Sequence, residues 1–142
     1  MFNPSREQVR SFFCESWRKH RERLVLQGAE ATAADLIVHH PEYHALLEDP
    51  DTAMVQEFTP ESGKMNPFLH LSLHLAIADQ ISIDQPAGIR AAYEALRTRL
   101  DVHEAEHALL ECLGETIWNA QRAGGELDAN AYLERIRRVA LG

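Results

Sequence analysis

Apolar residues recur at intervals of three and four along most of the chain, and this spacing limits the fold more than any other feature. Near the amino terminus, Val9, Phe12, Phe13, Trp17 and Leu24 share one side of a period of about 3.6 residues. No segment alternates apolar and polar residues as a half-buried strand does. The sequence therefore predicts an all-α protein.

Local start and stop signals divide this pattern into a compact bundle of five to six helices. Ser5 with Gln8, and Asp101 with Glu104, have the spacing of a capping box, which marks the start of a helix. The predicted segments are 5–26, 32–40 with a short continuation over 41–47, 67–81, 86–100, 101–123 and 128–141.

A break near Asp101 follows from the size of the protein. One unbroken helix from Pro86 to Ala123 would be about 57 Å long at about 1.5 Å per residue, which is longer than a compact domain of this size is wide. By contrast, the stretch from Glu48 to Met65 contains Pro50, Pro60, Gly63 and several acidic residues and lacks the helical pattern. We expect an irregular surface loop there.

Size and charge narrow the range of functions. The chain has 142 residues, about the size of one domain, so we expect a single domain over 1–142. Its 22 acidic and 14 basic residues give a net charge of -8, which repels nucleic acid and anionic membranes, so neither is an expected partner. No apolar run reaches the roughly 18 residues of a membrane span. Cys14 and Cys112 lack the spacing of a redox or zinc motif, so we expect reduced thiols and a cytoplasmic protein.

Six of the eight histidines form pairs whose members are four residues apart: His40 with His44, His70 with His74, and His103 with His107. Two imidazoles at this spacing project from one face of a helix and can bind one metal ion. The pair His40 and His44 is weaker evidence for a metal site because Pro41 interrupts the helical register between its members.

The pair His70 and His74 lies in a segment that is apolar on nearly every side, FLHLSLHLAIADQI. Leu73 and Ile77 share its face, so we expect both rings to be buried. A buried neutral imidazole has one donor and one acceptor nitrogen, and leaving either unsatisfied costs about 1–3 kcal/mol. Each ring must therefore bind something.

The pair His103 and His107 occupies positions that leucine fills elsewhere in its apolar series. Glu111 follows one turn later, whereas a drift of about 40° per step turns Glu115 away. Facing helices in a bundle commonly combine such side chains into a metal site. The predicted ligands are His70, His74, His103, His107 and Glu111.

Two interpretations of these residues stay open. In the first, they bind a divalent metal, which is zinc if four nitrogens suffice and iron, manganese or nickel if oxygen ligands and open positions are added. A neighbouring glutamate could then act as base toward a metal-bound water, which would be hydrolytic chemistry. In the second, they form a hydrogen-bonded His–Glu cluster with no cofactor, and the 48–65 loop and the last helix contact a protein partner. The sequence decides neither enzyme status nor oligomeric state.

Four segments in combination resemble one known family. They are MFNPSREQVRSFF, HHPEYHALLEDP, NPFLHLSLHLAIADQISIDQPAGIRAAYEAL and ECLGETIWNAQR. Together they are similar to the bacterial domain-of-unknown-function family 1841 over nearly the whole chain. That family is uncharacterised, so the resemblance assigns no functional residue. It does imply a bacterial protein of the cytosol.

Overall fold

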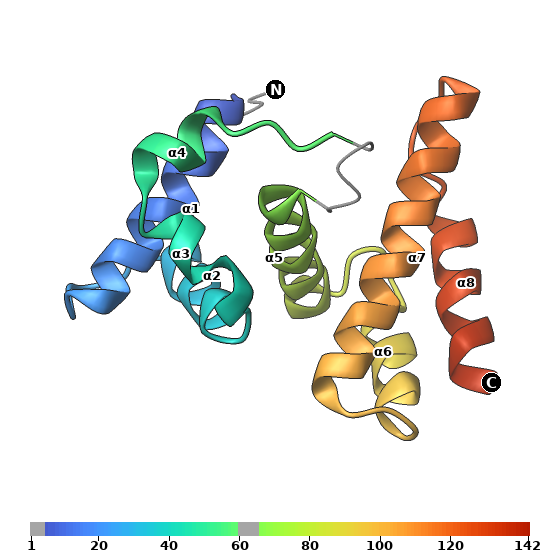
Figure 1. The fold of residues 1–142 in the computed structure, drawn as a ribbon. Helices are drawn as coiled ribbons and strands as arrows, with labels where there is room; N and C mark the ends of the chain where they lie inside the picture. The colour runs from blue at the N-terminus through green and yellow to red at the C-terminus, as the bar shows by residue number, and fades with distance from the viewer. Residues whose placement is uncertain (1–4, 60–65) are drawn as a thin grey trace. The chain divides into compact units, whose positions relative to one another are not determined.

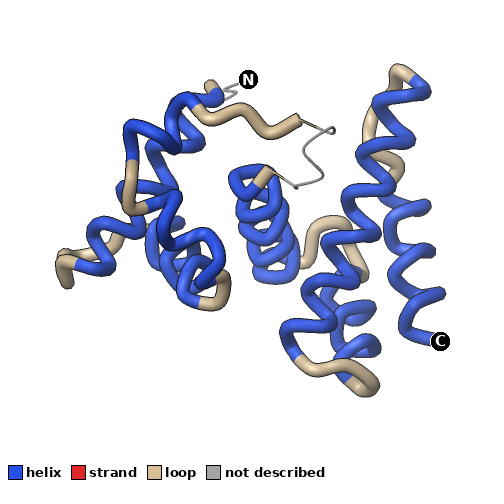
Figure 2. The backbone as a smooth tube through the Cα atoms, viewed as in Figure 1, coloured by secondary structure: helices blue, strands red, loops and turns tan. Residues whose placement is uncertain are grey.

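The computed structural model describes residues 5–59 and 66–142, which form eight α-helices, one short 3-10 helix and no strand (Figure 1). Helix dominates both parts of the described chain (Figure 2). The all-α prediction is confirmed, although the helices outnumber the five to six predicted. They fall into two compact units, Met1–Leu75 and Ala76–Gly142. The single domain stays a prediction.

The first unit contains the four amino-terminal helices, the 3-10 helix and the first half of α5. Their bounds are α1 Arg6–Arg21, α2 Ala29–Val38, η1 Pro41–Tyr43, α3 His44–Leu47, α4 Pro50–Val55 and α5 Pro67–Ile83.

Helix α1 begins at the predicted capping box but ends earlier than predicted. The Ser5 hydroxyl accepts a hydrogen bond from the backbone N–H of Gln8, whose side chain accepts one from the N–H of Ser5. The helix ends at Arg21, and Arg23 has a left-handed φ of 58°, which cannot continue an α-helix. Leu24, predicted on the buried face, is therefore outside the helix and 47% exposed.

Helix α4 lies inside the segment predicted to be an irregular loop, so that prediction was wrong for Pro50–Val55. A carboxylate oxygen of Asp49 accepts a hydrogen bond from the N–H of Thr52, and Pro50 occupies the first turn, where its missing N–H costs nothing. Proline here starts a helix instead of breaking one. Residues 60–65 of the predicted loop lie outside the described residues.

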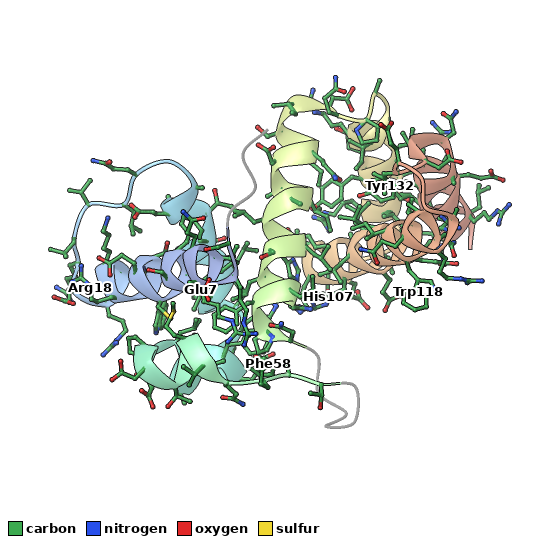
Figure 3. All side chains as sticks on the ribbon, turned by 90° about the horizontal axis from the view of Figure 1, so that it is seen from above. Glu7, Arg18, Phe58, His107, Trp118 and Tyr132 are labelled. Atoms are coloured by element: carbon green, nitrogen blue, oxygen red, sulfur yellow. The ribbon has the colours of Figure 1, made fainter. Side chains whose placement is uncertain are left out.

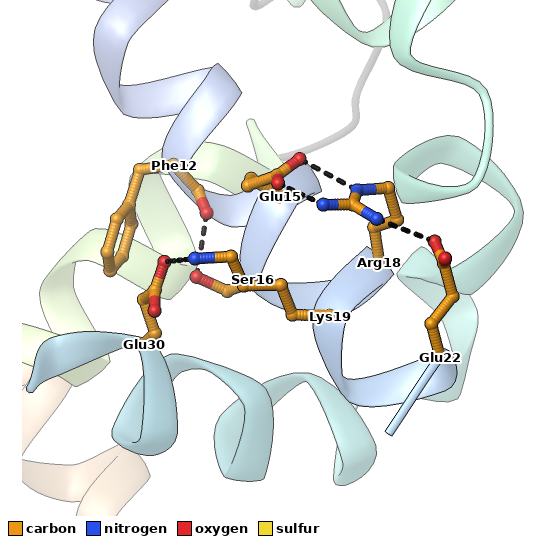
Figure 4. Close-up of polar contacts among 7 residues, drawn as sticks. All are labelled: Phe12, Glu15, Ser16, Arg18, Lys19, Glu22 and Glu30. Carbon is orange, nitrogen blue, oxygen red and sulfur yellow. Dashed lines mark hydrogen bonds and ion pairs between the residues drawn. The ribbon is translucent and has the colours of Figure 1, made fainter. Parts of the chain in front are cut away.

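The core of the first unit is apolar and is bordered by polar contacts of α1. Lys19 of α1 forms an ion pair of 2.8 Å with Glu30 of α2, and Arg18 bonds Glu15 of the same helix and Glu22 directly after it (Figure 4). The buried core residues are Phe13, Cys14, Trp17, Ala33, Ile37, Leu47, Ala53, Phe68 and Leu71.

The second unit contains the second half of α5 with α6 Ile89–Arg97, α7 Val102–Ala123 and α8 Ala129–Leu141. The predicted break is confirmed: Asp101 is the N-cap of α7 and forms a capping box with Glu104. Gly124 ends α7 with a left-handed φ of 69°, as the sequence also predicted.

Tyr132 is the largest fully buried side chain in the second unit, and Figure 3 labels it among the helices there. Its hydroxyl donates a hydrogen bond of 2.8 Å to the side-chain oxygen of Gln80. The other buried apolar residues of this unit are Ile77, Ile89, Ala92, Leu96, Ala105, Leu109, Leu110, Cys112, Leu113, Leu133 and Ile136. His103 is not among them: it is exposed in the first turn of α7, whereas the sequence placed it on the buried face.

None of the helices in the described part of the chain combines the length and the apolarity that a membrane crossing requires.

Candidate metal centre

Helix α5 presents the histidines at positions 70 and 74 from its first three turns. The side-chain oxygen of Asn66 accepts hydrogen bonds from the N–H groups of Phe68 and Leu69, and Pro67 is the first helical residue, as the sequence predicted. His70 and His74 then lie one turn apart on the same side. His74 is 2% exposed, as predicted, whereas His70 is only half-buried and not fully buried as predicted.

His40 lies two residues after the end of α2 and directly before η1, thirty residues before His70. Because it precedes Pro41, its backbone is held out of the α-helical region, and its φ is -127°. Its Nδ1 atom lies 2.7 Å from the backbone carbonyl oxygen of Leu36. A carbonyl can only accept, so Nδ1 carries the proton and donates it. In the neutral ring, the lone pair therefore belongs to Nε2.

The Nε2 atoms of these three histidines meet at one place. The Nε2 atom of His70 is 3.2 Å from that of His40 and 3.1 Å from that of His74. All three rings face one another edge-on, with interplanar angles of 73° for His40 and His70, 64° for His40 and His74, and 68° for His70 and His74. The nitrogens, not the ring faces, are thus brought together.

Hydrogen bonding among neutral rings accounts for only one of the two short distances. If the Nε2 of His70 is protonated, its one proton can point directly at only one of the two neighbouring nitrogens, and it has no lone pair to offer the other. If it is unprotonated, it has one lone pair and can accept from only one direction. A cation, in contrast, accepts electron pairs from all three nitrogens at once.

The distances also fit the geometry of a metal ion. With metal–nitrogen bonds of about 2.0–2.1 Å, two ligands are about 3.3–3.4 Å apart in a tetrahedral site and about 2.9 Å apart at a right angle. The observed 3.1 and 3.2 Å lie between these values. In addition, the hydrogen bond from His40 to a backbone carbonyl is the usual partner of a metal-binding imidazole, because it fixes both the tautomer and the ring orientation.

Tyr43 of η1 covers one side of this group, which we call the three-histidine cluster (His40, His70 and His74). Its ring stacks on His40 at 5.5 Å and 2°, and it meets His70 edge-on at 6.0 Å. Burial raises the pKa of the Tyr43 hydroxyl. The cluster is therefore enclosed on this side by a neutral aromatic residue.

The neighbouring histidines of the HHPEYH segment are engaged elsewhere. His44, the expected partner of His40, donates through Nε2 to the carbonyl of Ile37 and stacks on Trp17 at 4.3 Å. His39 is exposed, and its Nδ1 donates to the carbonyl of Asp35. The interruption of the helical register at Pro41, which made this pair weaker evidence in the sequence, thus sends the two rings to different partners.

The remaining predicted ligands lie on α7 of the second unit. His103 and His107 contact each other edge-on at 4.2 Å; His107 is half-buried. Glu111 is exposed, and Glu115 is 3.5 Å from the guanidinium of Arg135. The assignment of His103, His107 and Glu111 as metal ligands stays a prediction.

Comparisons with known proteins identify the family of the chain but give no activity. A family model described as "Domain of unknown function (DUF1841)" matches residues 5–138. No curated protein matches the chain, and no solved structure does. The function must therefore be argued from the residues themselves.

Proposed function

The chain belongs to this DUF1841 family, and we propose that it binds one divalent transition-metal ion through the Nε2 atoms of His40, His70 and His74. The observation that carries this proposal is the convergence of three Nε2 atoms, with two separations of 3.1 and 3.2 Å. Neutral tautomers of the three rings can direct a well-aligned hydrogen bond along only one of these two separations. Imidazole ligands favour zinc, iron or nickel over manganese, which prefers oxygen.

Three imidazole ligands also suggest which kind of reaction a metal at this site could catalyse. Three imidazoles are a common arrangement for a catalytic metal that keeps a water molecule in a further position, and the metal acidifies that water. Hydrolysis is therefore the activity class we would assay first. His103, His107 and Glu111 could add ligands, as the sequence predicts, and a His103→Ala/His107→Ala double variant tests that contribution separately.

We also propose that the protein is bacterial and cytoplasmic. Cys14 and Cys112 are free, buried thiols, and burial raises the pKa of each. Such cysteines resist oxidation and are typical of proteins from reducing compartments. Contact with a protein partner through the last helix stays a prediction.

Metal binding is tested first by metal analysis of protein purified without a histidine tag. We expect about one equivalent of metal per chain. Adding the same metal to chelator-treated protein at about 100 times its Kd should stabilise the folded state by about 2.7 kcal/mol, since a ligand that binds only the folded state shifts the equilibrium. At this size the melting temperature should rise by several degrees.

Three single variants test whether the three-histidine cluster causes this gain in stability. His40→Ala and His74→Ala should each abolish most of the metal-dependent gain, whereas His39→Ala should keep it, because His39 is adjacent to His40 but exposed. Circular dichroism checks that each variant remains helical. If no tested metal stabilises the chelated parent protein, or if His39→Ala and His40→Ala behave alike, the proposal fails.

A further inference from the structure

A pocket in the first unit lies where α1, the segment after α4 and the first turns of α5 meet. Its volume is about 310 Å³, which is at the lower end of the range for small-molecule sites and so suits a small ligand. None of the described residues that line it is a histidine, so the pocket is distinct from the three-histidine cluster. The polar residues that line it are Arg6, Arg10, Glu57, Asn66 and Ser72.

Arg10 uses only part of its hydrogen-bonding capacity on the protein. Its Nη1 atom donates to the backbone carbonyls of Ala53 and Gln56, whereas Nε and Nη2 donate no hydrogen bond within the described part of the chain and are not sealed from solvent. These two nitrogens form one edge of the guanidinium, and the N–H groups of that edge match the two oxygens of a carboxylate. Because Arg10 is 3% exposed, an acceptor in the pocket would offset the cost of burying this charge.

A second guanidinium, that of Arg6, lies beside the first. Its Nη2 atom is 3.2 Å from the carbonyl oxygen of Gln56, the same oxygen that Arg10 bonds at 2.9 Å. Burial, and next the positive charge of Arg6, lower the pKa of Arg10, so the two cations repel each other. Glu57 pairs with Arg6 at 3.0 Å and is the one acidic residue among those described around the pocket. The lining therefore keeps one net positive charge, which a monoanion would balance.

We propose that this pocket binds a small organic acid through a single carboxylate group. The free edge of Arg10 holds the carboxylate, and Arg6 adds a second positive charge beside it. The side-chain oxygen of Asn66 accepts from the N–H groups of Phe68 and Leu69, which leaves its NH2 group available to the ligand. With the Ser72 hydroxyl, this amide gives the pocket polar contacts for a substituent such as a hydroxyl group.

The test follows the NMR signal of the Arg10 Nε–H group in the full-length chain, with lactate and lactamide as probes. An Arg10→Lys variant identifies this signal by its loss. Lactate and lactamide are nearly identical in size and shape but differ by one negative charge. We expect lactate to shift the Arg10 signal with saturation at one molecule per chain, and to bind at least about tenfold more tightly than lactamide, which corresponds to about 1.4 kcal/mol.

Two further variants test the position of the site without disturbing Arg10. Arg6→Met should weaken lactate binding at least about fivefold, because it removes a positive charge beside the carboxylate. Arg21→Met removes the same charge from the last turn of α1, away from the pocket lining, and should bind lactate as the parent protein does. The inference is refuted if lactate leaves the Arg10 signal unchanged, if lactamide binds as tightly as lactate, or if Arg6→Met and Arg21→Met bind lactate equally well.

Discussion

Arg10 is the most deeply buried charged residue described, and its role is to join three elements of the first unit. It is 3% exposed, and one guanidinium nitrogen donates to the carbonyls of Ala53 at 2.8 Å and Gln56 at 2.9 Å. These carbonyls end α4, where a positive charge is favourable. The guanidinium also lies 4.9 Å from the ring centroid of Phe68, at the start of α5.

The first residue-scale prediction is that Arg10→Met lowers the free energy of unfolding by about 3 kcal/mol, because it leaves buried carbonyls without their charged donor. Arg6→Met is the matched control. Arg6 pairs with Glu57 at the surface, where an ion pair is worth about 1 kcal/mol or less. Urea unfolding followed by circular dichroism measures both. Equal losses in the two variants would show that Arg10 contributes no more than a surface charge.

Individual residues also show where sequence reasoning succeeds and where it stops. The spacing of His70 and His74 fixes their common face, because four residues make about one helical turn. No local spacing connects either of them to His40, which is thirty positions away in the sequence and reaches them only through the packing of α2 against the rest of the unit. The sequence paired His40 with His44 and gave no reason to prefer one of the two. Only the bend before Pro41 sends their rings to different partners.

At the scale of elements, α6 begins with an unusual cap. Asp84 lies in the left-handed region with a φ of 53°, and its carboxylate accepts hydrogen bonds from the backbone N–H groups of Gly88 and Arg90. The bonds from Arg90 and from Gly88 hold the pKa of this carboxyl below its usual value. The folded state therefore favours the charged form of the Asp84 carboxyl.

This cap predicts a particular dependence on pH. Because the pKa of Asp84 is lower in the folded state, the stability it contributes is present above the unfolded-state pKa of about 3.9 and is lost as the pH falls through the lower folded-state value. Asp84→Asn tolerates the left-handed backbone and keeps the acceptor oxygen but has no charge. We expect the parent protein to be more stable than Asp84→Asn at pH 6, with the difference shrinking below about pH 4. A difference that stays constant down to pH 2.5 would mean that the charge does not matter.

The helix ends that carry a local capping signal were predictable, and for a physical reason. The capping boxes at Ser5 and Asp101 and the glycine at position 124 satisfy backbone groups of the neighbouring turn, so their signals are local. Helix α4 was missed because Pro50 and the acidic residues around it suit both a loop and a first helical turn. Packing decides between the two, since Ala53 is fully buried. Sequence periodicity over six residues is too short to reveal such packing.

For the molecule as a whole, the division into two units predicts which segments of the chain a bound metal should stabilise. The boundary between the units falls inside α5, between Leu75 and Ala76. His40, His70 and His74 all precede this boundary, whereas His103, His107 and Glu111 all follow it. The proposed ligands and the additional ligands predicted from the sequence therefore belong to different units, and a measurement resolved along the chain can tell them apart.

Hydrogen exchange provides that measurement, because a ligand slows exchange most in the segments whose opening would release it. On adding metal to chelator-treated protein, we expect slower exchange in the last turn of α2, in η1 and in the first half of α5, with α8 unchanged. His39→Ala should reproduce this pattern, and His74→Ala should lose it. Protection that extends along α7 from His103 to Glu111, and that disappears in the His103→Ala/His107→Ala variant, would add those residues to the metal site. Protection confined to α7 would instead contradict the assignment of the metal to the three-histidine cluster, because a metal bound there must order the backbone that carries its ligands.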